Sequence, residues 1–242
     1  MTTTDAHRRR SQRLVAVAAV GALVLFAIVA VAVVLLQRDP APRAALRAQP
    51  SPTVSQSPTT ASDISWAKTS GVELPSSRTH GPRNVTATTA SGFGSSELGA
   101  AIAAVHVLIR SSAAAGPRAF EPTITQQVTG ANAAAMKLFV AQQYEQLRAE
   151  KGVPEGESIA GDADVLGYLI DAFAPGGTAA TVRVFLDSPA LSVRGQLLRF
   201  DVQLQRRNDD WAVVAPPRGD WGAASTVLSE PPAGLISYGD QP

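Results

Sequence analysis

The segment 197–205, Leu-Leu-Arg-Phe-Asp-Val-Gln-Leu-Gln, alternates apolar and polar side chains with a period of two. In a β-strand this alternation places one set of side chains on each face. One face is then buried and the other is wet or partly covered, as in many antiparallel sheets. The apolar set is Leu198, Phe200, Val202 and Leu204, and the opposite set is Arg199, Asp201, Gln203 and Gln205. The segment therefore predicts one strand of an antiparallel sheet.

Three neighbouring segments also have strand character, namely 164–173, 181–186 and 211–215. Turn signals separate neighbouring strands, at Gly176-Gly177 and at Asn208-Asp209. Together with the first segment they predict a four-stranded antiparallel sheet, which the family resemblance described below implies to be curved.

Helical periodicity precedes these strands in the chain. A helix is expected from Ser95 or Ser96, a weaker piece over 123–128, and a long helix over about 131–151. On the long helix one side is shared by Ala135, Leu138, Phe139, Gln142 and Gln146. Since helices come first and strands afterwards, we predict an α+β domain over 63–225, with a loop-rich start over 63–94.

The clearest single feature lies much earlier, in the apolar run 14–36. From Leu14 to Leu36 it contains no charge and no proline, and Gly21 is its only small interruption. At ~1.5 Å per residue a helix of this length spans about 35 Å, enough for a hydrocarbon core of ~30 Å. The apolar region of a signal peptide is shorter, so we predict an uncleaved transmembrane helix that contacts the lipid bilayer.

The formal net charge of +1 conceals a gradient. Residues 1–62 hold seven arginines and two acidic residues, a net +5, whereas residues 63–242 hold fourteen basic and eighteen acidic residues, a net −4. Four arginines precede the run at 14–36 and three follow it, which favours a cytoplasmic N terminus. We therefore expect a single-pass plasma-membrane protein with its domain outside the cytoplasm. A domain with a net charge of −4 repels the phosphate backbone of DNA or RNA, so direct nucleic-acid binding by this domain is not expected.

The remaining segments are predicted to lack a core. Residues 1–13 form a basic cytoplasmic tail, and 226–242 a flexible C-terminal tail. Residues 37–62 hold five prolines and seven Ser/Thr, a composition that predicts a disordered stalk.

Several classes of chemistry are excluded by missing residues. The chain has no cysteine, which rules out disulfides, thiolate zinc sites and a cysteine nucleophile. It has no P-loop motif and no G-x-S-x-G motif. A dinucleotide fingerprint fails after Gly92-Phe93-Gly94, because Glu97 occupies the position of the third glycine. We predict no cofactor, no metal and no enzymatic activity.

The best candidates for catalysis have simpler interpretations. His106 lies beside the apolar stripe of the first helix, which favours a core-edge histidine, and His80 lies in a turn. Asp162, Asp164, Asp171 and Tyr168 surround the first predicted strand. Carboxylates with shifted pKa values can abstract protons, but positions in an entry loop and at solvent explain these residues more simply.

Tryptophan and proline mark candidate contact residues. Trp66, Pro75 and Trp221 form the candidate partner surface, while a role in the core remains open for both tryptophans.

The layout of basic tail, span, stalk and helices-then-strands domain resembles the bitopic assembly factor of conjugative type IV secretion systems. More narrowly, the segments 71–76 (Gly-Val-Glu-Leu-Pro-Ser) and 211–217 (Trp-Ala-Val-Val-Ala-Pro-Pro), with Trp66, Gly81-Pro82 and Asp220-Trp221, are similar to proteins of actinobacterial integrative conjugative elements. The resemblance implies a cystatin-like (nuclear-transport-factor-like, NTF2-like) outer domain. It also implies a scaffold that oligomerises and contacts other channel proteins.

Two hypotheses follow. The first is a non-catalytic, membrane-anchored scaffold of a conjugative DNA-transfer apparatus, acting through protein–protein contacts. The alternative is a surface-anchored enzyme or ligand-binding protein that uses the cone pocket of a cystatin-like fold, lined by residues such as Tyr168 and Asp171.

Overall fold

The structure is a computed structural model that describes residues 63–159, 161, 163–187 and 196–240. The predicted basic tail, transmembrane helix and stalk, at 1–13, 14–36 and 37–62, lie outside the described residues. Within the described residues, no helix has both the length and the apolar character needed to cross a membrane.

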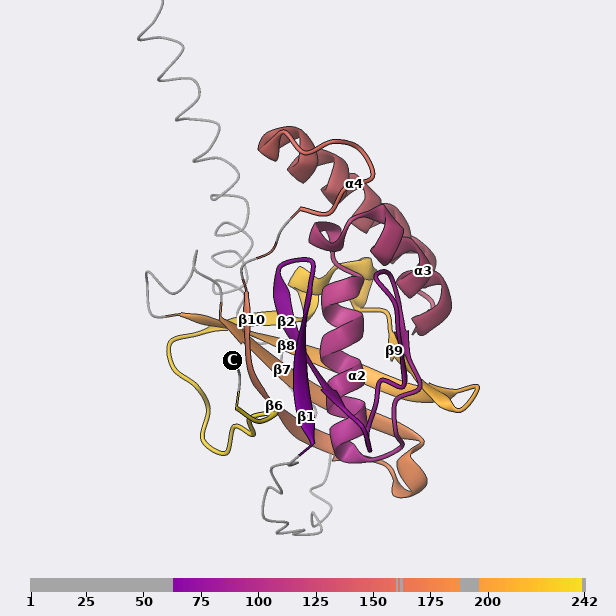
Figure 1. Ribbon diagram of the computed structural model, residues 1–242, viewed down its shortest axis with the longest axis vertical. Coiled ribbons are helices and arrows are strands. Elements are labelled where there is room, and N and C mark those ends of the chain that lie inside the picture. Colours follow the sequence, from indigo (N-terminus) through magenta and orange to yellow (C-terminus); the bar gives the residue numbers. More distant parts are fainter. Residues whose placement is uncertain (1–62, 160, 162, 188–195, 241–242) are drawn as a thin grey trace, which may run out of the picture. The chain divides into compact units, whose positions relative to one another are not determined.

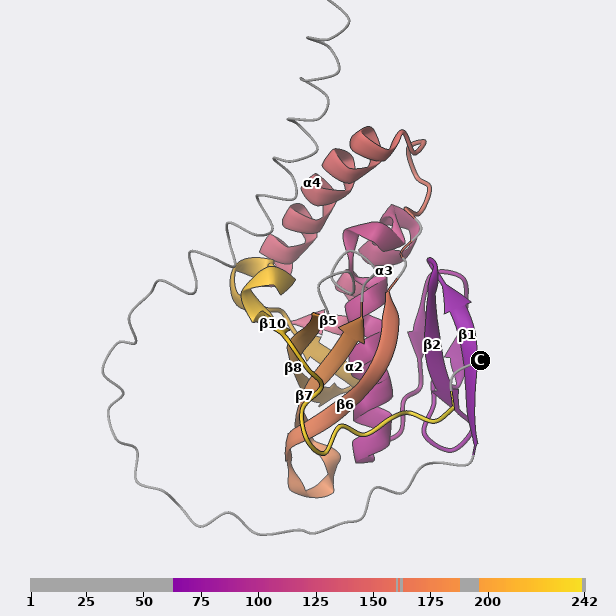
Figure 2. The ribbon, with the colours of Figure 1, turned by 90° about the vertical axis from the view of Figure 1, so that its left-hand side faces the viewer.

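The main sheet is built on an antiparallel meander of four strands, β6 (Asp164–Phe173), β7 (Ala179–Asp187), β8 (Leu197–Arg207) and β9 (Asp210–Val214). Two short strands extend it, and both are labelled in Figure 2. β5 (Val128–Thr129) pairs with β9 in the parallel direction, and β10 (Ser225–Leu228) pairs with the first half of β8.

The predicted fold class is therefore wrong in its sheet. The sheet is mixed and six-stranded, not the four-stranded antiparallel sheet of a cystatin-like domain. The two additional strands have two and four residues, too few to give an alternating pattern in the sequence. Their pairing is produced by the tertiary fold, which brings distant segments to β8 and β9.

Three helices accompany the sheet, α2 (Glu97–Arg110), α3 (Pro117–Gln127) and α4 (Ala133–Lys151). Ser96 is the N-cap of α2, where its Oγ accepts a hydrogen bond from the Gly99 N–H and so satisfies a free donor of the first turn. Four short 3-10 turns complete the helical part, η1 (Ala113–Ala115), η2 (Pro175–Gly177), η3 (Pro217–Gly219) and η4 (Trp221–Ala224).

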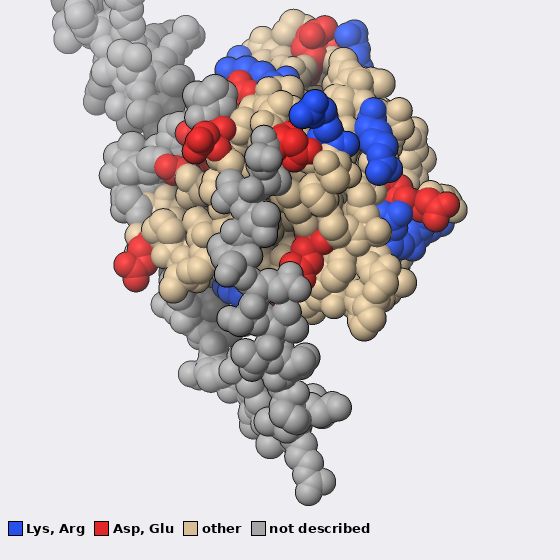
Figure 3. Space-filling view, turned by 60° about the horizontal axis from the view of Figure 1, so that its bottom comes forward, with Lys and Arg blue, Asp and Glu red and all other residues tan. Residues whose placement is uncertain are grey.

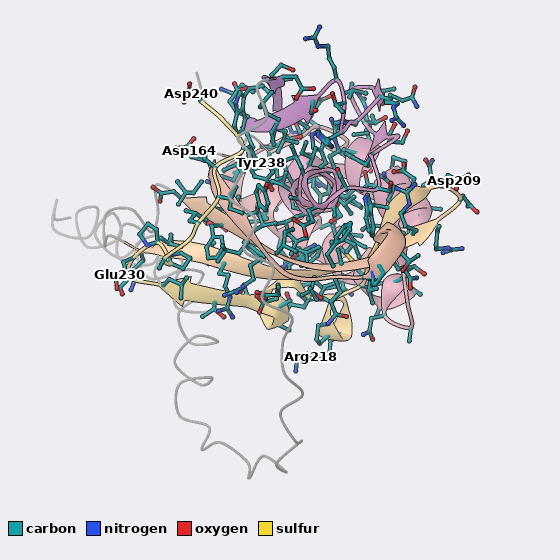
Figure 4. The ribbon with its side chains drawn as sticks, turned by 90° about the horizontal axis from the view of Figure 1, so that it is seen from below. Asp164, Asp209, Arg218, Glu230, Tyr238 and Asp240 are labelled. Carbon is teal, nitrogen blue, oxygen red and sulfur yellow. The ribbon has the colours of Figure 1, made fainter. Side chains whose placement is uncertain are left out.

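The loop-rich start folds into two hairpins. β1 (Ile64–Thr69) pairs with β2 (Val72–Ser77), and β3 (Asn84–Val85) pairs with β4 (Ala90–Ser91). The β1–β2 hairpin packs on the side of α2 that faces away from the main sheet, so α2 lies between two β-layers (Figure 4). This position explains why every residue of α2 from Gly99 to Arg110 is buried.

Helix α4 lies with α3 at one end of the domain and extends beyond the sheet (Figures 1 and 2). It buries Met136, Val140 and Tyr144, which follow one another at intervals of four residues. The side that the sequence singled out faces solvent instead, with Leu138 68% exposed. Alanine and glutamine side chains contribute little to a pattern of apolar and polar residues. Two sides of this helix therefore had nearly the same apolar character in the sequence, and the pattern did not decide which of them is buried.

Candidate functional site

The outer face of the main sheet, opposite α2, is a polar surface formed by several of the described strands. We call it the open face, and its side chains come from β6, β7, β8 and β10: Asp171, Thr181, Arg183, Arg199, Asp201, Gln203, Gln205 and Thr226. The inner face of the same strands carries Val182, Val184 and Val202, all fully buried. The alternation thus separates the core from this face over 180–184 and 198–205, whereas Phe185 and Leu197, which fall on the open-face side by alternation, are buried.

Four charged side chains form a continuous row on the open face. Arg183 of β7 pairs with Asp171 of β6, and its register partner on β8 is Asp201. Asp201 also accepts a hydrogen bond from Arg199 at 3.0 Å, and Arg199 donates to Thr226 Oγ1 of β10 at 3.1 Å. The row therefore alternates acid, base, acid and base across three strands, and we call it the charge row.

The charge row is accessible to a partner. The side chains of Arg183 and Asp171 are 31% and 37% exposed, and those of Arg199 and Asp201 are 27% and 44% exposed. Ion pairs this exposed contribute little to stability, about 0–1 kcal/mol each. Figure 3 shows one side of the domain, on which acidic and basic side chains are interspersed.

A shallow depression of about 380 Å³ adjoins the charge row. Its lining includes small side chains from the end of β6 and the start of β7, Ala172, Ala179 and Thr181. Gln203 and Gln205 of β8 and Val214 of β9 also line it. The alanines leave the space, and the glutamines supply amide donors and acceptors beside it.

The residues proposed for a catalytic pocket do not converge. Tyr168 points into the core, where its ring lies 4.7 Å from that of Tyr238, and burial raises the pKa of Tyr168 to about 12. Asp171 belongs to the charge row on the opposite face. Asp164 is exposed at the start of β6, and Asp162 lies outside the described residues.

His106 of α2 is a core histidine. It is 2% exposed, and its Nε2 lies 2.9 Å from the Pro75 carbonyl oxygen, so Nε2 carries the proton and donates. Burial lowers the pKa of His106 to about 3, with the charge of Arg110 adding to the effect and the Pro75 hydrogen bond opposing it. The ring is therefore neutral at ordinary pH and serves packing, as the sequence favoured.

His80 serves the N-cap of α2. Its Nδ1 lies 2.6 Å from Ser96 Oγ, the oxygen that accepts from the Gly99 N–H. A serine–histidine pair resembles part of a hydrolytic dyad, but here the hydroxyl is bound into the helix cap. Both side chains thereby fix the start of α2.

The candidate partner residues lie in two separate places. Trp66 and Pro75 are opposite one another in the β1–β2 hairpin, where Pro75 is buried and Trp66 packs edge-on against Tyr238. Trp221 lies in η4, edge-on to Phe200, and donates to Ser111 Oγ at 3.2 Å. They do not form one surface.

The sequence did not indicate how the β8–β9 turn holds the segment before α2. The two carboxylate oxygens of Asp210 accept hydrogen bonds from the N–H groups of Gly92 and Phe93 at 2.7 and 3.0 Å. Arg206 donates to the Phe93 carbonyl oxygen at 3.1 Å and lies over the ring of Trp211. These contacts explain why Gly92-Phe93-Gly94 is present without a nucleotide-binding role.

Metal-ligating side chains are not gathered in the described part of the chain. It contains no group of three or more His, Cys, Asp or Glu side chains arranged to hold a metal ion.

Comparison with known protein families assigns the chain to one of them. Residues 33–230 match the family described as Domain of unknown function (DUF8175). The chain belongs to this family. The DUF8175 match includes every helix and strand described above and ends just after β10. No curated protein and no solved structure matches the chain.

Proposed function

We propose that this DUF8175 chain is a membrane-anchored, non-catalytic scaffold that binds another protein through the open face, outside the cytoplasm. The observation that carries the proposal is the charge row beside the shallow depression. Charges of alternating sign favour a partner with the complementary order and disfavour other partners. Small-molecule sites, by contrast, are usually concave pockets that enclose most of the ligand.

The proposed location rests on the sequence alone. The apolar run 14–36 would anchor the chain in the plasma membrane, and the four arginines before it would keep the N terminus in the cytoplasm. The predicted stalk at 37–62 would hold the domain away from the bilayer.

A more specific proposal concerns the membrane apparatus in which the scaffold acts. The resemblance of the segments around Trp66 and Trp211 to proteins of integrative conjugative elements favours a conjugative DNA-transfer channel of the type IV secretion class. The partner would then be another channel protein whose contact surface carries acidic and basic side chains in alternation.

The test replaces the two basic members of the charge row, Arg183→Glu with Arg199→Glu, in the full-length chain in its host membrane. The matched control is Arg118→Glu, a basic residue 74% exposed in its side chain and distant from the open face. The double variant is expected to lower both plasmid transfer and co-purification with the channel proteins at least tenfold. The control is expected to change neither.

Circular dichroism checks that the double variant remains folded. If that variant destabilises the domain, Gln203→Lys probes the same surface, since Gln203 is exposed and lines the depression. Normal transfer and normal co-purification in a folded variant of the open face would overturn the proposal.

A further inference from the structure

The chain after β10 crosses the sheet and closes against its opposite edge (Figure 2). We call residues 229–240 the C-terminal segment. Ile236 and Tyr168 of β6 exchange two backbone hydrogen bonds, at 2.9 and 3.0 Å, in an antiparallel bridge. The segment thus supplies a short strand to the exposed edge of β6.

Tyr238 anchors the C-terminal segment in the core. It is 1% exposed, and its hydroxyl donates to the Ala101 carbonyl oxygen of α2 at 2.9 Å. Its ring lies 4.7 Å from the Tyr168 ring and 6.3 Å from the Trp66 ring, edge-on to the latter. Figure 4 shows Tyr238 between the β1–β2 hairpin and β6. Burial raises the pKa of Tyr238, which keeps the phenol protonated as a donor.

The groove that receives this segment is shaped for a backbone. A Cβ atom at Gly167 of β6 would lie 2.4 Å from the Ile236 carbonyl oxygen, so only glycine allows this approach. We call the site formed by Trp66, Ala101, Gly167 and Tyr168 the tyrosine groove. It fits an extended segment with an aliphatic residue two positions before a tyrosine.

The connection between β10 and the groove is weakly held. Residues Ser229, Glu230 and Pro231 are exposed, and so are Ala233 and Gly234. The backbone hydrogen bond of this connection joins the Leu235 N–H to the Pro232 carbonyl oxygen at 3.4 Å. Since the other contacts described above are made with the groove, a second copy of the chain offers the same contacts to this segment.

We propose that the C-terminal segment binds in trans, with residues 235–239 of one copy occupying the tyrosine groove of a second copy. Exchange of identical elements preserves the contacts at the groove. The equilibrium between monomer and exchanged dimer therefore depends on the conformation of the connection between β10 and the groove and on the local concentration of the chain. Anchoring copies in one membrane would raise that concentration. The inference deepens the proposed function by supplying the self-association of the scaffold, and it uses residues separate from the open face.

Disulfide trapping tests the exchange directly, because the chain has no native cysteine. A Cβ atom at Gly239 would lie 3.4 Å from Ile64 Cβ, close to the usual separation in a disulfide of about 3.5–4.5 Å. Full-length chains carrying either Ile64→Cys or Gly239→Cys, with different tags, are expressed in one membrane and oxidised. We expect a disulfide-linked dimer that carries both tags, and we expect Tyr238→Ala in the Gly239→Cys chain to reduce it at least fivefold.

Two outcomes would overturn the inference. One is the absence of the mixed dimer while the double variant in a single chain cross-links completely within itself. The other is a mixed dimer whose yield is unchanged by Tyr238→Ala, which would indicate random collision.

A complementation experiment keeps the inference testable if the cysteine variants misfold. Gly167→Val blocks the groove but keeps the segment, whereas a chain truncated after Glu230 keeps the groove but lacks the part of the segment that binds there. Each chain alone is expected to be monomeric, and their mixture to form a 1:1 complex in detergent. Two folded chains that fail to associate would refute the exchange, while a transfer defect of the charge-row variant would still support the proposed function.

Discussion

The indole Nε1 of Trp211 donates to the carbonyl oxygen of Gly94 at 2.7 Å and thereby ties β9 to the segment that leads into α2. The two residues are far apart in sequence, and their contact fixes where the buried helix begins relative to the sheet. Asp210 and Arg206 bind the preceding residues Gly92 and Phe93. The β8–β9 turn therefore positions the core helix.

Trp211→Phe is expected to destabilise the domain by about 1–3 kcal/mol, because it leaves the part-buried Gly94 carbonyl oxygen without this donor. For a chain of this size the melting temperature should fall by about 2–4 °C per kcal/mol. Circular dichroism of the full-length chain in detergent measures the change. Trp66→Phe is the matched control, since the Trp66 Nε1 has no hydrogen-bond partner in the described part of the chain. An equal loss in both variants would contradict the role of the hydrogen bond.

His106→Gln tests the pH dependence of stability. The pKa of His106 in the folded chain is about 3, below its ordinary value of 6.5, so the unfolded chain binds a proton more readily. The native histidine should therefore cost stability as the pH falls from about 6.5 towards 3, whereas glutamine, which retains an N–H donor for Pro75, should not.

Urea unfolding between pH 5 and 8 measures this difference. A native-like slope in His106→Gln would show that another group causes the acid sensitivity.

Asp63→Asn addresses a lower pH range. Backbone and side-chain hydrogen bonds from Thr79 and Ser77 lower the pKa of Asp63 to about 2. Because the folded pKa lies below the unfolded value, Asp63 contributes stability above about pH 4 that is lost as the pH falls towards 2. The asparagine variant should be less stable at pH 6 and should change less between pH 4 and 2. Ser77→Ala, which removes one donor, should give an intermediate profile in the same unfolding series.

Helix α4 offers a paired test of which side packs. Met136→Ala should destabilise the domain by about 2–5 kcal/mol, because the side chain is fully buried and its removal leaves a cavity. Leu138→Ala, on the exposed side, should change stability by no more than about 0.5 kcal/mol. Thermal unfolding of both variants decides the matter, and a larger loss for Leu138→Ala would reverse the assigned orientation.

The strands with strong alternation could be predicted because their pattern records burial directly. The two faces of 198–205 lie as expected, and the polar set became half of the open face, whereas Leu197 is buried on the polar side. The charge row could not be predicted, since Asp171 and Arg183 meet only through the pairing of β6 with β7. The tyrosine groove was missed for a related reason: a lone Tyr238 in a Gly/Pro-rich tail carries no periodic signal.

Although β1 to β4 occupy the segment 63–94 that was predicted to be loop-rich, the sequence by itself determined the meander of β6 to β9, a helix start at Ser95 or Ser96 and the core position of His106. Each of these depends on residues close in the chain, where periodicity, turn chemistry and capping act. Only the tertiary structure decided that β5 and β10 widen the sheet, that α4 packs on Met136, and that Tyr238 closes the edge of β6. These contacts join residues distant in sequence, and their free energy comes from burial and backbone pairing that no local pattern contains.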